Sequence, residues 1–260
     1  MSPAPTDLVL AALARREPVE LPVAMVVAHP DDETVGAGGS LHLFRRLLLV
    51  HVTDGAPRGM GDARAAGFAT HTAYAQARRR ELDAALAAGR VRARRVMLPV
   101  ADQGASLQLG ELAATLTPLL ADAAVVLTHA YEGGHPDHDA VAFAVQASGR
   151  PRIEMAGYHA APNGHMVAGR FLDDAGAIVA AAIVAALGDG ERARRDEMME
   201  CFATQRLTLR PFFGWTQERF RAAPRYDFTR PLAARAYYDG FDWGMDSRRW
   251  RALAAGAGPC

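Results

Sequence analysis

The sequence predicts an α/β fold: a Rossmann-like, mainly parallel sheet with helices on both faces. Up to about residue 157, strand-like apolar runs alternate with helix-like segments. Residues 23–27 are apolar at every position, which is typical of a strand buried on both faces of a parallel sheet. The chain has 260 residues, half of them hydrophobic, which suffices for one full core. We therefore expect a single domain over 1–260, with its core at about 23–205 and an irregular C-terminal extension at about 206–260.

Local patterns predict the elements in order. Short apolar runs indicate strands at 23–28, 47–53, 95–100 and 124–128. Helical patterns indicate helices at 34–46, 70–88, 107–120 and 140–147, with a Gly-rich loop at 55–67. Beyond residue 150 the pattern is less regular, and we expect strands at 153–159 and 177–184 and a helix at 191–205. The segment from 206 should pack over the domain, because its aromatic content is too high for disorder.

Composition excludes several classes of function. All 29 basic residues are Arg, so no lysine is present for a Schiff base or a P-loop. The 29 acidic residues balance them, and nucleic acid is not an expected partner. The two cysteines form no CxxC, which excludes a Cys-rich zinc site and fits a reducing compartment. We see neither a membrane span nor a secretory signal, and expect a cytoplasmic protein.

Two polar clusters follow strands of the predicted sheet. The first, AHPDDE at 28–33, follows strand 23–28, and the second, GGHPDHD at 133–139, comes after strand 124–128. Ligands of open α/β sheets bind beyond the carboxyl ends of the strands. Adjacent carboxylates repel one another unless a cation, a proton or water offsets them, and a divalent metal is the simplest explanation. Either cluster alone could also be a surface turn, but two at strand ends of one sheet favour a site.

The spacing of the first cluster suits a metal. His29 and Asp32 are three residues apart in a segment made rigid by Pro30, so both side chains can face one centre. A third ligand from the second cluster would give two His and one Asp with an open position for water, the arrangement of a catalytic zinc. The same ligands would accept Fe²⁺, Co²⁺ or Ni²⁺. Asp31 would lie beside the water, where a general base belongs.

Together, the two motifs resemble those of the LmbE/PIG-L family of zinc-dependent N-deacetylases. The resemblance extends to TDG at 53–55, to RxxE at 78–81, to Asp102 and, weakly, to TQ at 204–205. It therefore covers most of residues 23–205. The two histidine motifs are specific as a pair, whereas the other matches would be weak alone.

The resemblance implies that His29, Asp32 and His138 bind Zn²⁺ and that Asp31 is the general base. It also implies that His135 lies at the developing oxyanion and that Asp137 orients it. It also implies that Arg78 and Asp102 bind substrate hydroxyls, with Tyr131 as the phenol nearest to the second motif. Without the resemblance, Arg78 and Glu81 could equally form an ion pair one helical turn apart.

The implied function is hydrolysis of an N-acetyl or other N-acyl group from an amino sugar, such as N-acetylglucosamine, or from another sugar-containing small molecule. The expected partner is that small molecule, and a homo-oligomer is compatible with the sequence. One alternative is a zinc amidase for a non-sugar amide or thiol conjugate, because the motifs specify the metal and amide hydrolysis better than the group on nitrogen. A metal-binding module without catalysis is disfavoured by the spare base Asp31.

A dinucleotide-binding Rossmann protein is a further, weaker alternative. The segment 36–41 begins like GxGxxG but has Leu41 where the third glycine is needed, and Asp54 follows the second strand. The carboxylates of 29–33 occupy the turn that would hold the pyrophosphate, and they would repel it.

Overall fold

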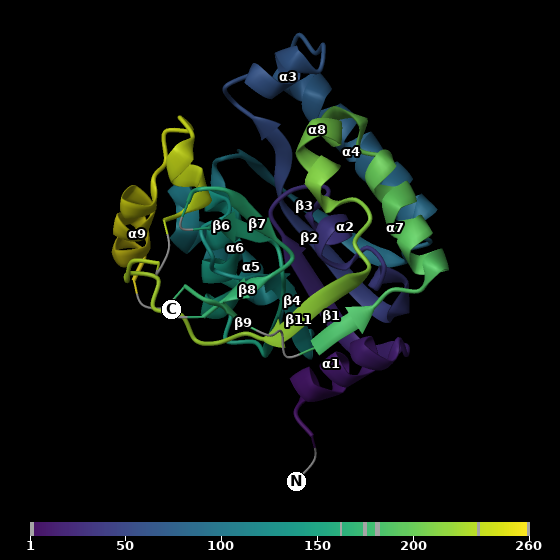
Figure 1. Cartoon of the computed structure of the whole chain (residues 1–260). Coiled ribbons are helices and arrows are strands. Elements are labelled where there is room, and N and C mark those ends of the chain that lie inside the picture. The colour runs from purple at the N-terminus through teal and green to yellow at the C-terminus, as the bar shows by residue number, and fades with distance from the viewer. Residues whose placement is uncertain (1–2, 162, 174–175, 180–182, 233–234, 259–260) are drawn as a thin grey trace.

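A seven-stranded mixed sheet forms the centre of the protein, in the strand order β10-β11-β5-β4-β1-β2-β3 (Figure 1). The computed structural model describes residues 3–161, 163–173, 176–179, 183–232 and 235–258. The strands of this sheet are β1 Val19–Val27, β2 Phe44–Pro57, β3 Ala93–Asp102, β4 Val125–His129, β5 Arg152–Met155, β10 Ile183–Ala186 and β11 Gln217–Ala222. Two small hairpins lie outside it, formed by β6 Tyr158–Ala160 with β7 Met166–Ala168, and by β8 Phe171–Leu172 with β9 Ile178–Val179.

Neighbouring strands from β5 to β3 are parallel, whereas β11 pairs antiparallel with both β5 and β10. The predicted mainly parallel α/β fold is therefore confirmed. Parallel strands bring their carboxyl ends to one edge of the sheet, so the segments that follow β1, β2, β3 and β4 meet there.

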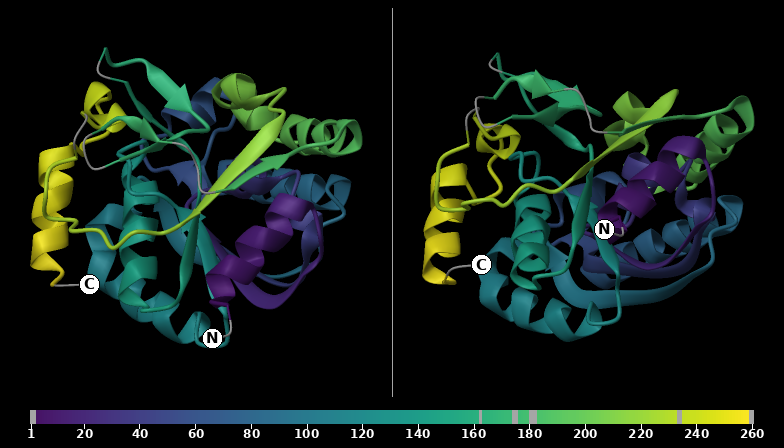
Figure 2. Two further views of the ribbon diagram at one scale, coloured as in Figure 1. Left: turned by 60° about the horizontal axis from the view of Figure 1, so that its bottom comes forward. Right: turned by 90° about the horizontal axis from the view of Figure 1, so that it is seen from below.

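Helices cover both faces of the sheet (Figure 2). On one face lie α1 Pro5–Arg15, α4 His71–Ala88 and α7 Asp189–Glu200, and on the other lie α5 Leu109–Leu119, α6 Pro136–Ala147 and α9 Ser247–Gly256. The remaining helices are α2 Asp32–Ala37, α3 Gly61–Ala65 and α8 Arg206–Leu209. No helix among the described residues is long and apolar enough to cross a membrane.

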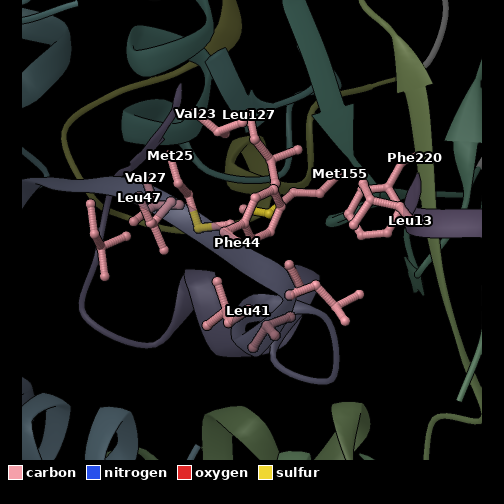
Figure 3. Packing of buried hydrophobic residues seen from close by; sticks show 14 of the residues in the cluster. Leu13, Val23, Met25, Val27, Leu41, Phe44, Leu47, Leu127, Met155 and Phe220 are labelled. Carbon is pink, nitrogen blue, oxygen red and sulfur yellow. The ribbon is translucent and has the colours of Figure 1, made fainter. Parts of the chain in front are cut away.

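Strand β1 has apolar side chains on both faces of the sheet, so helices must bury both faces. Its side chains alternate: Met25 and Val27 belong to the core cluster that α1, α4 and α7 complete, and Ala24 and Val26 to the cluster on the α5 and α6 side. All four are fully buried. Figure 3 shows the first cluster, with Met25 of β1 and with Leu13 of α1 beside Phe220 of β11.

The predicted helix at 34–46 is wrong in its extent. Helix α2 ends at Ala37, a short 3₁₀ turn follows, and β2 already begins at Phe44. The helix ends early because residues 39 and 40 form hydrogen bonds with residues that are distant in the sequence. The Glu218 carboxylate accepts hydrogen bonds from the Gly39 N–H and from the Ser40 hydroxyl, while Arg16 donates to the Gly39 carbonyl. This glycine-rich segment is thus tied to β11 and does not form a phosphate-binding turn.

The chain after 150 is more regular than the sequence indicated. Strand β11 lies within the predicted C-terminal extension but forms part of the central sheet, between β10 and β5. The predicted strand 177–184 divides between β9 and β10, and its residues 180–182 lie outside the described residues. The predicted helix 191–205 ends at Glu200, as α7.

Candidate metal centre

The two histidine motifs meet at the carboxyl edge of the sheet. His29 and Asp31 directly follow β1, and Asp32 begins α2. His135 is the N-cap residue of α6, which begins four residues earlier than predicted, so His138 projects from its first turn. All five residues are buried, with exposed fractions of 6–9%. Side chains a hundred residues apart in sequence thus share one buried cluster.

Asp32 lies between two of the predicted ligands. Its Oδ2 is 3.2 Å from His29 Nδ1, and its Oδ1 is 3.1 Å from His138 Nε2. Asp32 thus contacts both predicted histidine ligands, each through a different carboxylate oxygen. Donor atoms of His29 and His138 group with His135, and those of Asp32 and His138 group with His129, within 4.8 Å of one another.

A second grouping extends the cluster towards β3. His29, His135, Asp102 and Asp137 offer donor atoms within 4.8 Å of one another. His29 Nε2 lies 3.0 Å from Asp102 Oδ1, yet both atoms are buried without a hydrogen-bond partner. Buried polar atoms are normally paired, so two unpaired atoms side by side indicate a missing ligand. Asp102 thus lies beside the predicted metal ligands and also lines the cavity there, while its binding of a substrate hydroxyl stays a prediction.

His129 is a member of the cluster that the sequence prediction missed. It is the last residue of β4, stacks on the His138 ring at 4.0 Å between centroids, and its Nε2 accepts a hydrogen bond from the Ala28 N–H. Burial and the neighbouring His138 lower the pKa of His129 to about 4, so its imidazole is neutral. Because the Nε2 lone pair is already used, we read His129 as a support for His138. A histidine directly after strand 124–128 was the available signal.

Asp31 has a strained backbone and a fixed side chain. Its φ of 139° lies where non-glycine residues are rare, a conformation that costs about 1–3 kcal/mol and is typical of functional sites. Arg78 Nη2 is 2.8 Å from Asp31 Oδ2 and also donates to the Pro30 carbonyl. Burial raises the pKa of Asp31 to about 7, against the opposing effect of the Arg78 charge.

The structure places Arg78 against the first motif. The side chain is only 2% exposed, and it donates to Asp31, to the Pro30 carbonyl and to the Gly55 carbonyl. Its Nη1 also lies 3.5 Å from Glu81 Oε2, so the ion pair offered as the alternative is present. Arg78 therefore holds the first motif in place, and its binding of a substrate hydroxyl stays a prediction. Glu81, its predicted neighbour, accepts hydrogen bonds from Thr204 and so joins α4 to the segment before α8.

Glu33 stabilises the turn of the first motif. It is fully buried, its Oε2 accepts a hydrogen bond from the Asp31 N–H, and the same oxygen lies 3.0 Å from His51 Nε2. Its Oε1 accepts a hydrogen bond from the Thr34 hydroxyl. Its role is to hold the backbone that carries Asp31.

The predicted orientation of His135 by Asp137 takes a different form. The Asp137 carboxylate accepts hydrogen bonds from the backbone N–H groups of Gln103 and Ala105, and its own backbone N–H donates to His135 Nδ1. This bond leaves Nε2 as the protonated nitrogen of a neutral His135. Burial and the nearby His29 lower the pKa of His135 well below its usual value, so its imidazole is neutral.

The predicted role of Tyr131 as a substrate-binding residue does not fit its position. Tyr131 packs in an aromatic cluster with Tyr226, Phe228 and Trp250, and it lines a different cavity from the metal centre. The phenol at the centre is instead Tyr158 of β6, whose ring meets His138 edge-on at 5.4 Å. Burial raises the pKa of Tyr158, so its hydroxyl stays protonated.

The metal centre lies in a cavity of about 540 Å³. Its lining includes the predicted residues His29, Asp31, Asp32, Arg78, Asp102, His135 and His138. Two further walls come from the C-terminal part of the chain: one from residues 207–212, and the other from Tyr237, Phe241 and Trp243. The Trp243 ring lies 4.9 Å from that of His135. A buried cluster with donor atoms for a cation thus opens into a space large enough for a small molecule.

The fold and this cluster define an α/β protein with a metal-binding centre at the carboxyl edge of a mainly parallel sheet. Residues 24–148, which contain both motifs, match the family described as PIG-L, GlcNAc-PI de-N-acetylase. This match to the PIG-L (LmbE-like) family model confirms the resemblance noted in the sequence. No curated protein sequence is significantly similar to the chain.

Solved structures of deacetylases share the fold. Teicoplanin deacetylase Orf2 in its zinc-inhibited form is 18% identical, with a TM-score of 0.58, and the match covers 79% of this chain and 98% of that one. The A40926 pseudoaglycone deacetylase Dbv21 is 19% identical, with a TM-score of 0.57 and coverage of 80% and 100%. N,N'-diacetylchitobiose deacetylase from Pyrococcus horikoshii is 16% identical, with a TM-score of 0.57 and coverage of 83% and 87%.

Proposed function

We propose that this protein is a zinc-dependent hydrolase that removes an N-acetyl group, or another N-acyl group, from an amino sugar or a sugar-containing small molecule. The observation that carries the proposal is that Asp32 contacts both His29 and His138 in a buried cluster beside Asp31. The family match and the similar structures, a teicoplanin deacetylase and a diacetylchitobiose deacetylase among them, support this reaction and a sugar-like substrate.

In this proposal His29, Asp32 and His138 hold the ion. When bound, zinc would lower the pKa of a water towards about 7 and polarise the amide carbonyl. The unpaired His29 Nε2 and Asp102 Oδ1 support the fit, because a dication would satisfy buried atoms that have no partner. The cluster contains the four carboxyl groups of Asp31, Asp32, Asp102 and Asp137, one buried Arg and four His, and this set of side chains also favours an added positive charge.

The side chains then divide the remaining steps. Asp31, held by Arg78, takes the proton of the attacking water. The neutral His135 presents an Nε2–H, and Tyr158 a protonated hydroxyl, either of which can donate to the oxygen that gains negative charge. The proton held by Asp31 is available to the departing amine. The strained backbone of Asp31 keeps this carboxylate beside the ligand group.

The test is acetate release from N-acetylglucosamine, diacetylchitobiose and an N-acetylated glycopeptide. We expect release from at least one of them, its loss after dialysis against a chelator, and its recovery on addition of Zn²⁺; parallel additions of Fe²⁺, Co²⁺ and Ni²⁺ rank the metals. Release that a chelator does not reduce would contradict the zinc mechanism. Hydrolysis of simple N-acyl amides or thiol conjugates, with none of the sugars, would favour the amidase alternative.

A further inference from the structure

The segment 237–243 is hydrogen-bonded to both ends of the second motif. The Tyr237 N–H donates to the Gly133 carbonyl at 2.7 Å, and the Tyr238 hydroxyl donates to the Asp139 carboxylate at 3.0 Å. Asp139 is fully buried, and its carboxylate also accepts a hydrogen bond from the Gly133 N–H. The same carboxylate therefore joins the two ends of the motif to each other and to the segment. Figure 1 shows the segment as the yellow turn that precedes α9.

The segment is also fixed from the side of α9. The Asp239 carboxylate accepts hydrogen bonds from the N–H and the hydroxyl of Ser247, the first residue of α9. Within that helix, the buried Trp250 donates its indole N–H to the Pro136 carbonyl at 3.0 Å, inside the second motif. The segment and α9 thus bind the motif together, and the position of the segment relative to the motif is set by several hydrogen bonds.

Ring contacts connect the segment to the two side chains that can donate to the oxyanion. The Trp243 ring lies 4.9 Å from that of His135, and the Tyr237 ring meets that of Tyr158 edge-on at 5.8 Å. Between them, the Phe241 ring lies 5.1 Å from Tyr237 and stacks on Trp243 at 4.5 Å. A continuous row of rings therefore runs from His135 to Tyr158, and aromatic rings in contact restrict one another's orientation.

The orientation of these two donors matters for the reaction. Loss of one donor to an oxyanion typically lowers kcat by about 10²–10³-fold, and a misplacement of about 1 Å can cost about 10²-fold. The Asp137 N–H determines which nitrogen of His135 carries the proton, because it donates to Nδ1. The Trp243 ring beside that imidazole restricts the direction in which the remaining N–H points.

We propose that Tyr238 is a positioning residue, whose hydrogen bond to Asp139 holds the segment 237–243 against the second motif. The segment in turn fixes the rings of His135 and Tyr158. This inference rests on the proposed function, in which these two side chains donate to the oxyanion. Tyr238 itself is 1% exposed and does not line the cavity, so it acts through the segment and not by contact with a substrate.

The kinetic test is Tyr238→Phe, which removes the hydroxyl and keeps the ring, assayed on whichever N-acetylated substrate is hydrolysed. We expect kcat to fall about tenfold or more with KM changed less than about twofold, because misaligned donors weaken binding of the transition state alone. Zinc content should not change. Tyr226→Phe is the matched control: its hydroxyl accepts a hydrogen bond from Arg221 and lies away from the metal cavity, so kcat should stay at the wild-type value.

Four outcomes of this comparison would overturn the proposal. They are an unchanged kcat in Tyr238→Phe, a rise in KM alone, a loss of zinc, or an equal fall of kcat in Tyr226→Phe. The last result would show that any lost buried hydrogen bond lowers activity through stability.

A spectroscopic test needs no turnover and so separates this inference from the proposed function. The NMR signals of the His135 ring protons, identified by their absence from His135→Gln, report the position of the Trp243 indole through its ring current. Trp243→Leu defines these signals without the indole. We expect Tyr238→Phe to move them towards the Trp243→Leu positions and Tyr226→Phe to leave them unchanged. Wild-type His135 signals in Tyr238→Phe would overturn the inference, whether or not the protein hydrolyses a sugar amide.

Discussion

Two buried charged clusters lie close to the segment 130–135, and they differ in how their polar atoms are satisfied. In the metal centre, His29 Nε2 and Asp102 Oδ1 converge without hydrogen-bond partners. In the second cluster, Arg221 is bound by Glu154, by the Leu172 carbonyl and by the Tyr226 hydroxyl. The second cluster lines a larger cavity, of about 760 Å³, yet its guanidinium is already paired.

The contrast shows what distinguishes a site from a structural network. Acidic residues and a cavity are present in both places, so neither feature identifies a site. Glu132 in the second cluster accepts a hydrogen bond from the Leu172 N–H, and Glu154 pairs with Arg221. Paired charges hold the β5, β8 and β11 segments together, whereas His29 Nε2 and Asp102 Oδ1 lack hydrogen-bond partners, which favours a bound ligand. Four substitutions test this difference, the largest expected effect first.

Asp32→Ala should abolish zinc binding and reduce acetate release to background, because Asp32 lies between both histidine ligands. Zinc content per folded protein, measured by mass spectrometry, checks this directly. Glu154→Gln is the matched control from the second cluster and should retain zinc. Full zinc content in Asp32→Ala would contradict the assignment of the ligands.

Asp31→Asn should keep the zinc but lower kcat/KM by about 10²–10⁴-fold, since the amide cannot accept the proton of the attacking water. The neighbouring substitutions Asp31→Asn and Asp32→Ala should thus separate activity from metal content. Near-normal turnover by a zinc-replete Asp31→Asn protein would refute the general base.

Arg221→Met should lower the free energy of unfolding by about 3 kcal/mol, because it leaves the buried Glu154 without its partner. Zinc content and activity per folded molecule should not change. Arg230→Met provides the control: this residue pairs with Asp227 at the rim of the same cavity but is 82% exposed, and its loss should cost less than about 1 kcal/mol. Denaturant titration measures the free energy of unfolding of both variants. Loss of zinc from Arg221→Met would contradict the separation of the two clusters, because it would show that Arg221 supports the metal centre.

Glu132→Gln should change the pH dependence of stability. Burial and the nearby Glu154 raise the pKa of Glu132 from 4.5 to about 8. The folded state therefore binds this proton more tightly than the unfolded chain, and the resulting stability is complete below pH 4.5 and is lost as the pH rises to about 8. Between pH 5.5 and 7.5 the wild type should lose about 1 kcal/mol per pH unit relative to Glu132→Gln. Parallel stability curves for the two proteins would show that Glu132 ionises normally.

Local sequence predicted the parts of the fold and site that depend on local patterns. The apolar runs around Val26 and Val126 located the central strands, and the paired histidine motifs located the metal centre, because parallel strands must bring their ends together. Sequence could not locate features that depend on distant partners. The helix after Asp32 stops early because Glu218 binds Gly39, and Arg78 turns inwards because Asp31 and the Pro30 carbonyl accept its donors.

The aromatic residues show the same limit. Tyr131 is next to the second motif in sequence but turns into the core with Phe228 and Trp250, while Tyr158 reaches the metal centre from a hairpin after β5. Proximity in sequence therefore ranked the wrong phenol first. The walls formed by Leu207 and Trp243 come from a segment whose composition predicted only packing.

We propose that the two motifs form one metal centre around Asp32. This proposal can be tested with a crystal structure of the zinc-loaded protein, with anomalous diffraction recorded on both sides of the zinc absorption edge. We expect one anomalous peak bound by His29, Asp32 and His138, with the Asp31 carboxylate beside it. A peak held instead by Asp102, His135 and Asp137, or no peak in the cavity, would contradict it.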